Sequence, residues 1–285
     1  MDIQTQSAGN SSVDISVMKV PGWKQYRWLL HGISTRAGGV SSVYGKNTLN
    51  LGWTKEDDPA SVRENRRRFL SLVTNNSRDT VLIGIRQIHS GIVRVIRETD
   101  GPFEGRLQTS EGKAVLEGDG LITDVPGVLL GVGTADCVPV LLIDVEKKVV
   151  GAFHAGWRGT AARIAEQGVA TMTAEFGSRV DDMVAAVGPS IGPCCYTVGE
   201  EVRRAFGKFD YADELFGSNA QDVRLNLWKA NQRQLMDAGV DPGRITVVGE
   251  CTACAREENG ELRYFSHRGE KGVTGRMLNV VGVSD

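Results

Sequence analysis

The chain has 285 residues, 41% of them hydrophobic, which suffices for a large core in one big domain or two small ones. Its 33 basic and 35 acidic residues give a formal net charge of −2. No strongly basic face is therefore expected, which argues against nucleic acid or an anionic membrane as a main partner. No apolar stretch approaches the roughly 20 residues of a membrane-spanning helix.

The first residues, MDIQTQSAGNSSVDIS, are polar and lack the basic n-region and the apolar h-region of a secretory signal. We therefore expect residues 1–20 to form a disordered or frayed N-terminus. Five cysteines in a long chain without an export signal indicate reduced thiols and a cytoplasmic location. An odd number of cysteines also cannot be fully paired within one chain.

Short segments rich in β-branched residues and bounded by Gly, Pro, Asp or Asn are typical of strands. No internal repeat and no low-complexity linker separates them. In chain order the predicted strands are 28–33, 81–85, 92–96, 120–123, 128–132, 138–143, 149–153, 183–187, 245–248 and 277–283.

Helices are predicted between these strands. Asp58-Pro59 is a typical start of the first helix, and Thr160 is expected to cap a second helix with apolar residues at helical spacing. Two more predicted helices span residues 199–206 and 226–238. Hairpin-like strand pairs with scattered helices favour a mixed α/β (α+β) fold with much antiparallel sheet, since no regular βαβ repeat is visible.

In the segment 134–160, TADCVPVLLIDVEKKVVGAFHAGWRGT, Cys137 lies directly before one short apolar run and His154 lies directly after the next. If the runs pair as a β-hairpin around a charged turn, opposing residues have numbers that sum to about 293. His154 then lies opposite Pro139, and its Cα lies roughly 7–8 Å from that of Cys137. A thiol and an imidazole at one end of a sheet can share a metal ion or a proton.

The chain contains only four histidines, which are His31, His89, His154 and His267. His89 precedes Ser90-Gly91, a typical turn, and a histidine beside a turn is accessible. With Cys137 and His154 it makes a Cys-His₂ set, and three protein ligands with an open fourth position are typical of catalytic zinc. From spacing alone, three unrelated polar residues at strand ends remain the alternative, because the long gaps are not a diagnostic zinc motif.

The loop after His154 joins a predicted strand to a helix and contains Gly156, Arg158 and Gly159. The glycines permit close backbone approach, free N–H groups favour an anion, and the arginine fork suits phosphate or carboxylate. An ordinary left-handed turn with a solvated arginine is the alternative. Other arginines in glycine-rich loops are candidates for the same anion pocket; they are Arg36, Arg268 and Arg276.

The remaining cysteines are the adjacent pair Cys194-Cys195 and the CxxC formed by Cys251 and Cys254. A CxxC is a weak signal alone, but together with the pair it is a candidate for a second, four-thiolate zinc site. A thioredoxin-like redox role is not favoured, because the CxxC does not open a clear helix after a strand. Buried structural thiols are the simpler alternative.

The following segments occur in order from residue 31 to the C-terminus: HGISTRAGGVS (31–41), LNLG (49–52), DDPASVRENRRR (57–68), QIH (87–89), GDGLITDVPG (118–127), TADCVPVLLID (134–144), HAGWRGT (154–160), GPSIGPCCYTVGEEV (188–202), LNLW (225–228), CT (251–252) and FSHRGEKGVTGR (265–276). On these segments the chain resembles the YfiH-like family. That family is also called the multicopper polyphenol oxidoreductase (laccase-domain) family, and it is described as a family of multifunctional purine nucleoside enzymes.

The resemblance implies a single catalytic domain, here residues 21–285, with a layered α/β/β/α sandwich and a mixed, largely antiparallel sheet. It implies zinc bound by His89, Cys137 and His154, with copper as the alternative that the family name suggests. It also implies phosphorolysis of adenosine, inosine, guanosine and methylthioadenosine, and deamination of adenosine. The expected partners are therefore a purine nucleoside and phosphate, and we expect a monomer or homodimer.

The residues and the resemblance together give a set of candidate site residues. The catalytic candidates are Cys137, His154, Asp136 and Arg158, and the substrate-binding candidates are Arg36, Gln87, Gly156, Gly159, Arg268 and Arg276. Two departures from the family pattern stand out. Ser90 occupies a position where the family usually has Gly, and residues 266–269 read Ser-His-Arg-Gly where an aromatic-Arg-Arg run is common.

Four histidines cannot supply a type-1 copper and a trinuclear cluster, so a multicopper mechanism is not expected. A Cys-His₂ zinc with an open position activates water at neutral pH, which deamination of adenine at C6 requires. One alternative is a hydrolase or amidase with a Cys137 nucleophile activated by His154, assisted by Asp136 or Asp119. Others are a non-enzymatic nucleotide- or metal-binding module and a copper-linked polyphenol oxidoreductase.

Overall fold

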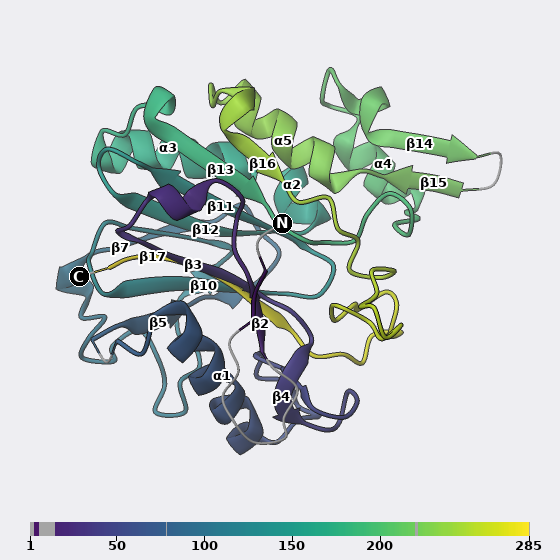
Figure 1. The fold of residues 1–285 in the computed structure, drawn as a ribbon. Helices are drawn as coiled ribbons and strands as arrows, with labels where there is room; N and C mark the ends of the chain where they lie inside the picture. Colours follow the sequence, from purple (N-terminus) through teal and green to yellow (C-terminus); the bar gives the residue numbers. More distant parts are fainter. Residues whose placement is uncertain (1–2, 6–14, 78, 220–221, 285) are drawn as a thin grey trace.

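The computed structural model describes residues 3–5, 15–77, 79–219 and 222–284. Two six-stranded sheets lie face to face, and helices cover their outer faces (Figure 1). The resulting four layers, α/β/β/α, confirm the predicted fold class of a mixed α/β sandwich. No helix among the described residues is both long and apolar enough to cross a bilayer.

The first sheet has the strand order β1-β2-β3-β17-β10-β5. Its strand pairs are antiparallel except for the parallel pair of β10 and β5 at one edge. The strands are β1 (Ile3–Thr5), β2 (Ser16–Met18), β3 (Leu29–Ser34), β17 (Met277–Val283), β10 (Val128–Thr134) and β5 (Val81–Gly84).

The second sheet has the order β16-β13-β11-β12-β9-β7. It is antiparallel in its centre and has one parallel pair at each edge. Its strands are β16 (Ile245–Val247), β13 (Met183–Val187), β11 (Val138–Asp144), β12 (Val149–Ala155), β9 (Gly120–Thr123) and β7 (Val93–Ile96). Each of the strands predicted from the sequence is present in one of the two sheets.

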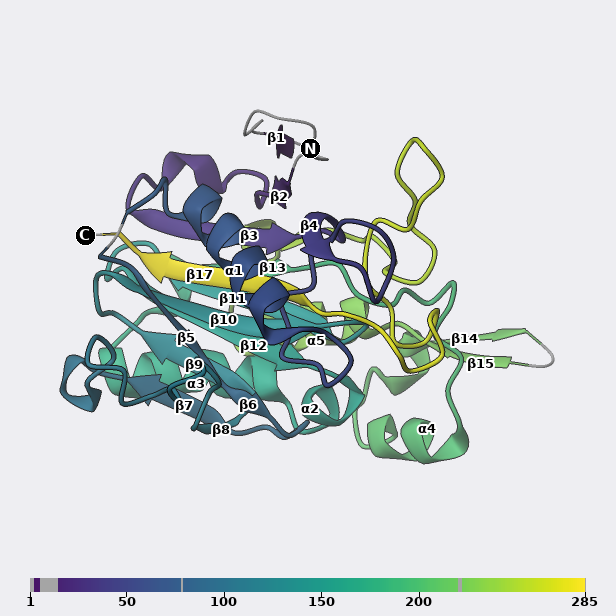
Figure 2. The same ribbon diagram turned by 90° about the horizontal axis from the view of Figure 1, so that it is seen from below.

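Helix α1 packs on the first sheet, whereas α3 and α5 pack on the second (Figure 1). The helices are α1 (Pro59–Val73), α2 (Trp157–Ala161), α3 (Ile164–Phe176), α4 (Glu200–Phe206) and α5 (Leu227–Asp237). Short 3₁₀ helices span Trp23–Gln25, Glu98–Asp100, Val180–Asp182, Ala212–Leu215 and Pro242–Arg244. The small strands are β4 (Ala37–Ser41), β6 (Arg86–Gln87), β8 (Glu117–Gly118), β14 (Phe216–Asn219) and β15 (Asp222–Leu225). The hairpin of β14 and β15 projects from the body of the molecule (Figure 2).

The central strands are buried on both faces. Leu130, Leu141 and Val281 fill the space between the sheets, and Phe153 and Met172 fill the space between the second sheet and α3. Burying one such side chain contributes about 1.5–3 kcal/mol. A strand with apolar neighbours on both faces has apolar side chains on both faces. Its sequence is therefore a continuous apolar run and does not alternate between apolar and polar residues.

The hairpin of β11 and β12 has the predicted register. Val138 pairs with Ala155 and Pro139 pairs with His154, so opposing residue numbers sum to 293 (138 + 155). The charged turn therefore sits where it was predicted, and Cys137 and His154 reach the same end of the second sheet.

Two expectations about local structure are wrong. The expected frayed segment 1–20 includes β2, which pairs with β3 and buries Met18 at 1% exposure, because its apolar side chains complete the first sheet and the layer beneath it. Residues 1–2 and 6–14 of that segment lie outside the described residues. Thr160 does not cap the long helix, since it lies inside α2, and a left-handed Arg163 (φ 62°) separates α2 from α3.

Candidate active site

Three side chains from different parts of the chain meet at one end of the second sheet. The ligand atoms that His89, Cys137 and His154 offer all lie within 4.8 Å of one another. His89 lies in the turn after β6, Cys137 lies directly before β11, and His154 is the penultimate residue of β12. His154 is buried, Cys137 is half-buried and His89 is exposed, so the group is open to solvent on one side.

Asp119, which is fully buried, holds both histidines. Its Oδ1 lies 2.8 Å from Nδ1 of His154 and accepts a hydrogen bond from the backbone N–H of His89 at 3.0 Å. Its Oδ2 accepts from the N–H and the hydroxyl of Ser90. These bonds fix the turn in which His89 adopts a left-handed backbone (φ 58°), and they engage only Nδ1 of His154, which leaves its Nε2 available to the site.

Asp136 holds the turn that presents Cys137. It also has a left-handed backbone (φ 89°), a strained conformation for a residue with a side chain. Its carboxylate accepts hydrogen bonds from the hydroxyls of Thr252 and Ser266, both at 2.7 Å, and from the N–H of Arg268 at 2.6 Å. The carboxylate predicted as catalytic is thus engaged by three donors, which suits a positioning role.

Gly156 and Gly159 act by leaving space. A Cβ on Gly156 would lie 2.9 Å from Sγ of Cys137 and 3.3 Å from Cδ2 of His89, so a side chain there would push on two members of the site. A Cβ on Gly159 would lie 3.0 Å from the carbonyl oxygen of Ser90. Neither glycine is among the residues that line the cavity, and the contacts of both are packing contacts with the site.

Cys137 and His154 perturb each other. Burial disfavours the thiolate, but the charge of His154 and hydrogen bonds from His154 and His89 outweigh it and lower the pKa of Cys137 to about 6. Burial would lower the pKa of His154, yet the Cys137 thiolate and Asp119 raise it to about 9. The pair is therefore a thiolate and an imidazolium at neutral pH when no metal is bound.

This donor set fits a metal ion. One thiolate and two imidazoles are ligands of zinc, and Asp119 on Nδ1 of His154 is the carboxylate–histidine arrangement that orients metal-binding histidines. The half-open face of the group leaves room for a further ligand.

The site opens into a cavity of about 900 Å³, within the size range of pockets for small molecules. Arg158, Arg268 and Arg276 line it, together with His267 and Gln87. Among the described residues, no carboxylate lies within ion-pair distance of the three arginine side chains. The guanidinium of Arg158 lies over the Trp157 ring, 4.4 Å from its centroid.

Two other predicted substrate-binding residues are used differently. Arg36 does not line the cavity, because its guanidinium pairs with Glu270 at 2.7 Å and covers the Phe265 ring. The side-chain amide of Gln87 makes two hydrogen bonds of 2.8 Å with the backbone of Gly133, so it ties β6 to β10. Gln87 lines the wall, but its polar atoms are already paired.

Sequence reasoning gave Asp119 only an assisting role in one alternative and assigned no site role to Ser90, Thr252 or Tyr196. The signal for Asp119 was a carboxylate between two glycines, Gly118 and Gly120, ahead of a buried strand. The serine at position 90, a departure from the family pattern, uses its hydroxyl to hold Asp119. Burial and the Cys137 thiolate raise the pKa of Tyr196, a cavity residue, to about 12.

The fold and the site define an α/β/β/α enzyme with a Cys-His₂ centre in a cationic cavity. Residues 30–284 match the family described as multi-copper polyphenol oxidoreductase laccase. A purine nucleoside phosphorylase of Deinococcus radiodurans is 38% identical over 256 residues, which are 89% of this chain and 88% of that protein. The adenosine deaminase RL5 of an unknown prokaryotic organism is 37% identical, over 79% of this chain and 85% of that protein.

Solved structures of the same family have the same fold as this chain. The crystal structure of the Bacillus licheniformis hypothetical protein YfiH has a TM-score of 0.82 at 31% identity, covering 95% of this chain and 96% of that one. The chain therefore belongs to the YfiH-like family of laccase-domain proteins, whose relatives are named as enzymes.

Proposed function

We propose that the chain is a zinc-dependent purine nucleoside enzyme. It cleaves adenosine, inosine, guanosine and methylthioadenosine with phosphate, and it deaminates adenosine. The observation that carries the proposal is the convergence of His89, Cys137 and His154 in the wall of a cavity whose lining includes Arg158, Arg268 and Arg276, which have no carboxylate partner among the described residues. The names of the relatives, a purine nucleoside phosphorylase and an adenosine deaminase, support the reaction class.

Zinc is favoured over copper by the ligands. A multicopper centre needs many histidines, and this chain has four, one of which, His31, is buried against Trp23 away from the site. A single blue copper takes Cys-His₂ ligands with a weak axial methionine, and no methionine is among the described residues that line the cavity. An oxidase assay with added copper should therefore stay at background.

When bound, zinc supplies Lewis-acid activation of water or of a substrate atom at neutral pH. The chain's own residues orient the reactants. Asp119 keeps Nδ1 of His154 occupied and Nε2 directed to the metal, while Asp136 holds the turn that offers the thiolate of Cys137. Neither carboxylate is free to act as a general base, because each already accepts several hydrogen bonds.

Phosphate is assigned to the arginines. Arg158 is the second residue of the short helix α2 and lines the cavity together with His89, Cys137 and His154, so an anion held by its guanidinium would lie close to the metal ligands. Arg268 and Arg276 line the same cavity. The helix dipole is a minor contribution, since α2 has only five residues. The Trp157 and Tyr196 side chains in the cavity wall offer flat apolar surface to a purine base.

The test uses purified, zinc-loaded protein with adenosine, in the presence and absence of phosphate. The expected products are adenine and ribose 1-phosphate in the phosphate sample, and inosine in both samples. Adenine release that does not depend on phosphate would contradict phosphorolysis. Absence of all three products would contradict the proposal as a whole.

A cysteine hydrolase or amidase is the second candidate, and one observation favours it. Cys137, His154 and Asp119 form a nucleophile–base–carboxylate series, with Asp119 on Nδ1 of His154 as in a catalytic triad. Iodoacetamide separates the candidates. If Cys137 binds zinc, its thiolate should resist alkylation until the metal is chelated. If Cys137 is a free nucleophile, it should react at once, and the enzyme should lose activity without any change in metal content. None of the five cysteines, all of which lie among the described residues, forms a disulfide, which also fits a cytoplasmic enzyme.

A further inference from the structure

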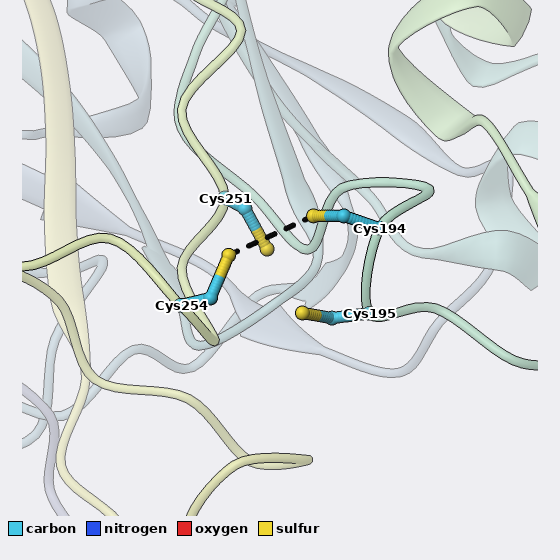
Figure 3. A group of neighbouring side chains, drawn as sticks. All are labelled: Cys194, Cys195, Cys251 and Cys254. Atoms are coloured by element: carbon cyan, nitrogen blue, oxygen red, sulfur yellow. Dashed lines mark hydrogen bonds between the residues drawn. The ribbon is translucent and has the colours of Figure 1, made fainter.

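We propose that Cys194, Cys195, Cys251 and Cys254 form a second metal site, which holds one zinc ion and fixes one wall of the catalytic cavity. The four side chains come from two loops that are far apart in the sequence, and their sulfurs point toward a common centre (Figure 3). All four Sγ atoms lie within 4.8 Å of one another. The site goes beyond the proposed function and does not depend on it.

The spacing of the sulfurs matches a single tetrahedral ion. A zinc–sulfur bond of about 2.3 Å places the sulfurs of a regular tetrahedron about 3.8 Å apart. Sγ of Cys194 and Sγ of Cys254 lie 3.7 Å apart, too far for a disulfide and close to that tetrahedral edge. An iron–sulfur cluster would insert several irons and sulfides between the thiolates and would need a wider spacing.

The surroundings suit metal-bound thiolates. The N–H of Gly192 donates to Sγ of Cys251 at 3.2 Å, and such N–H···S bonds support a thiolate ligand. The guanidinium of Arg224 donates to the carbonyl oxygen of Cys194 at 2.5 Å, which places a positive charge beside four negative ligands. The Cys251–Cys254 segment is a tight turn, in which the N–H of Ala255 donates to the carbonyl oxygen of Cys251.

Both loops also build the catalytic cavity. Tyr196, which follows Cys195, lines the cavity, and so does Ile191 on the same loop. Thr252, which follows Cys251, donates to the carboxylate of Asp136, the residue that holds the Cys137 turn. Without an ion, the contacts between the loops include one bridge between Ser190 and Cys251. A metal at the four sulfurs would clamp the loops and thereby fix the cavity wall.

Cobalt(II) is the probe, because tetrahedral cobalt–thiolate complexes give intense visible absorption and ligand-to-metal charge-transfer bands. The variant Cys137→Ala removes the thiolate of the first site, so cobalt–thiolate bands in this variant report on the second site alone. We expect one cobalt per chain with tetrahedral thiolate bands in Cys137→Ala. When Cys194→Ser and Cys254→Ser, which change two exposed side chains, are added to Cys137→Ala, we expect the affinity for cobalt at the second site to fall by at least about 100-fold.

The double variant Cys194→Ser/Cys254→Ser, with Cys137 intact, tests the clamp. We expect a lower melting temperature and a raised KM for the nucleoside, while one zinc per chain remains at His89, Cys137 and His154. Two results would overturn the site: a Cys137→Ala chain that takes up no cobalt as a thiolate complex, or bands that persist when Cys194→Ser/Cys254→Ser is combined with Cys137→Ala. The site would also be overturned if the chain, soon after the reductant is removed, has a mass two hydrogens below that of the reduced chain and peptide maps show a Cys194–Cys254 cross-link. That result would identify a disulfide.

Discussion

Nδ1 of His154 lies 2.8 Å from Oδ1 of Asp119, and this pair fixes the geometry of the whole site. The same carboxylate accepts hydrogen bonds from the backbone of His89 and Ser90. Asp119 therefore orients one metal ligand through its ring and another through its backbone. A second buried carboxylate, that of Asp136, does the same for the turn of Cys137.

Replacing Asp119 should weaken the metal site more than the fold. In Asp119→Asn the amide cannot accept with both of its polar atoms, so His154 and the His89 turn lose their common support. We expect zinc affinity to fall about 10–100-fold, measured by competition with a chelator. Asp144→Asn is the matched control, since Asp144 is also fully buried but holds the turn after β11. Equal loss of zinc in both variants would contradict the assigned role.

A methyl group on Gly156 should disturb the site directly. The new Cβ would lie 2.9 Å from Sγ of Cys137, which is closer than packed atoms tolerate. We expect Gly156→Ala to lose most turnover and to bind zinc weakly, while its circular dichroism spectrum stays that of the wild type. In Gly217→Ala the new Cβ meets no atom within 4 Å, and this control should keep full activity. Normal turnover in Gly156→Ala would show that the close approach is not needed.

Arg158 should act on phosphate and not on the nucleoside. Loss of its charged hydrogen bonds corresponds to about 1.5–3 kcal/mol, so we expect Arg158→Ala to raise the KM for phosphate about 10–100-fold. The KM for adenosine in the deamination reaction should change little. Steady-state kinetics with each substrate varied gives both numbers. Arg179→Ala, at an exposed arginine paired with Asp181, is the control. An equal rise in both KM values would argue against a phosphate role.

His31 should make stability depend on pH. Burial, followed by the nearby Lys19 charge, lowers the pKa of His31 from 6.5 to about 3. Between these values the unfolded chain binds a proton that the folded chain does not, so stability is present above pH 6.5 and is lost as the pH falls toward 3. We expect urea unfolding to show up to about 1.4 kcal/mol less stability per pH unit from this residue.

Comparison of two variants isolates the His31 contribution. His31→Gln should have a shallower decline of unfolding free energy between pH 6 and 4 than the wild type, by up to about 1.4 kcal/mol per pH unit. His267→Gln, at an exposed histidine, should keep the wild-type slope. If His31→Gln and the wild type decline in parallel, the depressed pKa of His31 is contradicted.

The sequence predicted the elements better than the contacts between them. The strands and the register of the β11–β12 hairpin follow from apolar runs and one turn, which are local signals. The break between α2 and α3 depends on the left-handed backbone of Arg163, and a sequence pattern does not predict that conformation for an arginine. Arg36 resembled the cavity arginines in its glycine-rich loop, but its partner Glu270 is distant in the sequence. This pairing forms because β3 and β17 are neighbours in the first sheet, which the local sequence does not show.

The central claim is that zinc at His89, Cys137 and His154 is required for nucleoside turnover. The most direct measurement is zinc content and phosphorolysis of adenosine in the same samples of wild type and Cys137→Ala. The account predicts that Cys137→Ala loses one zinc per chain together with turnover, and that chelation and zinc return abolish and restore turnover in the wild type. Loss of turnover with the zinc content unchanged would contradict it and identify Cys137 as a nucleophile.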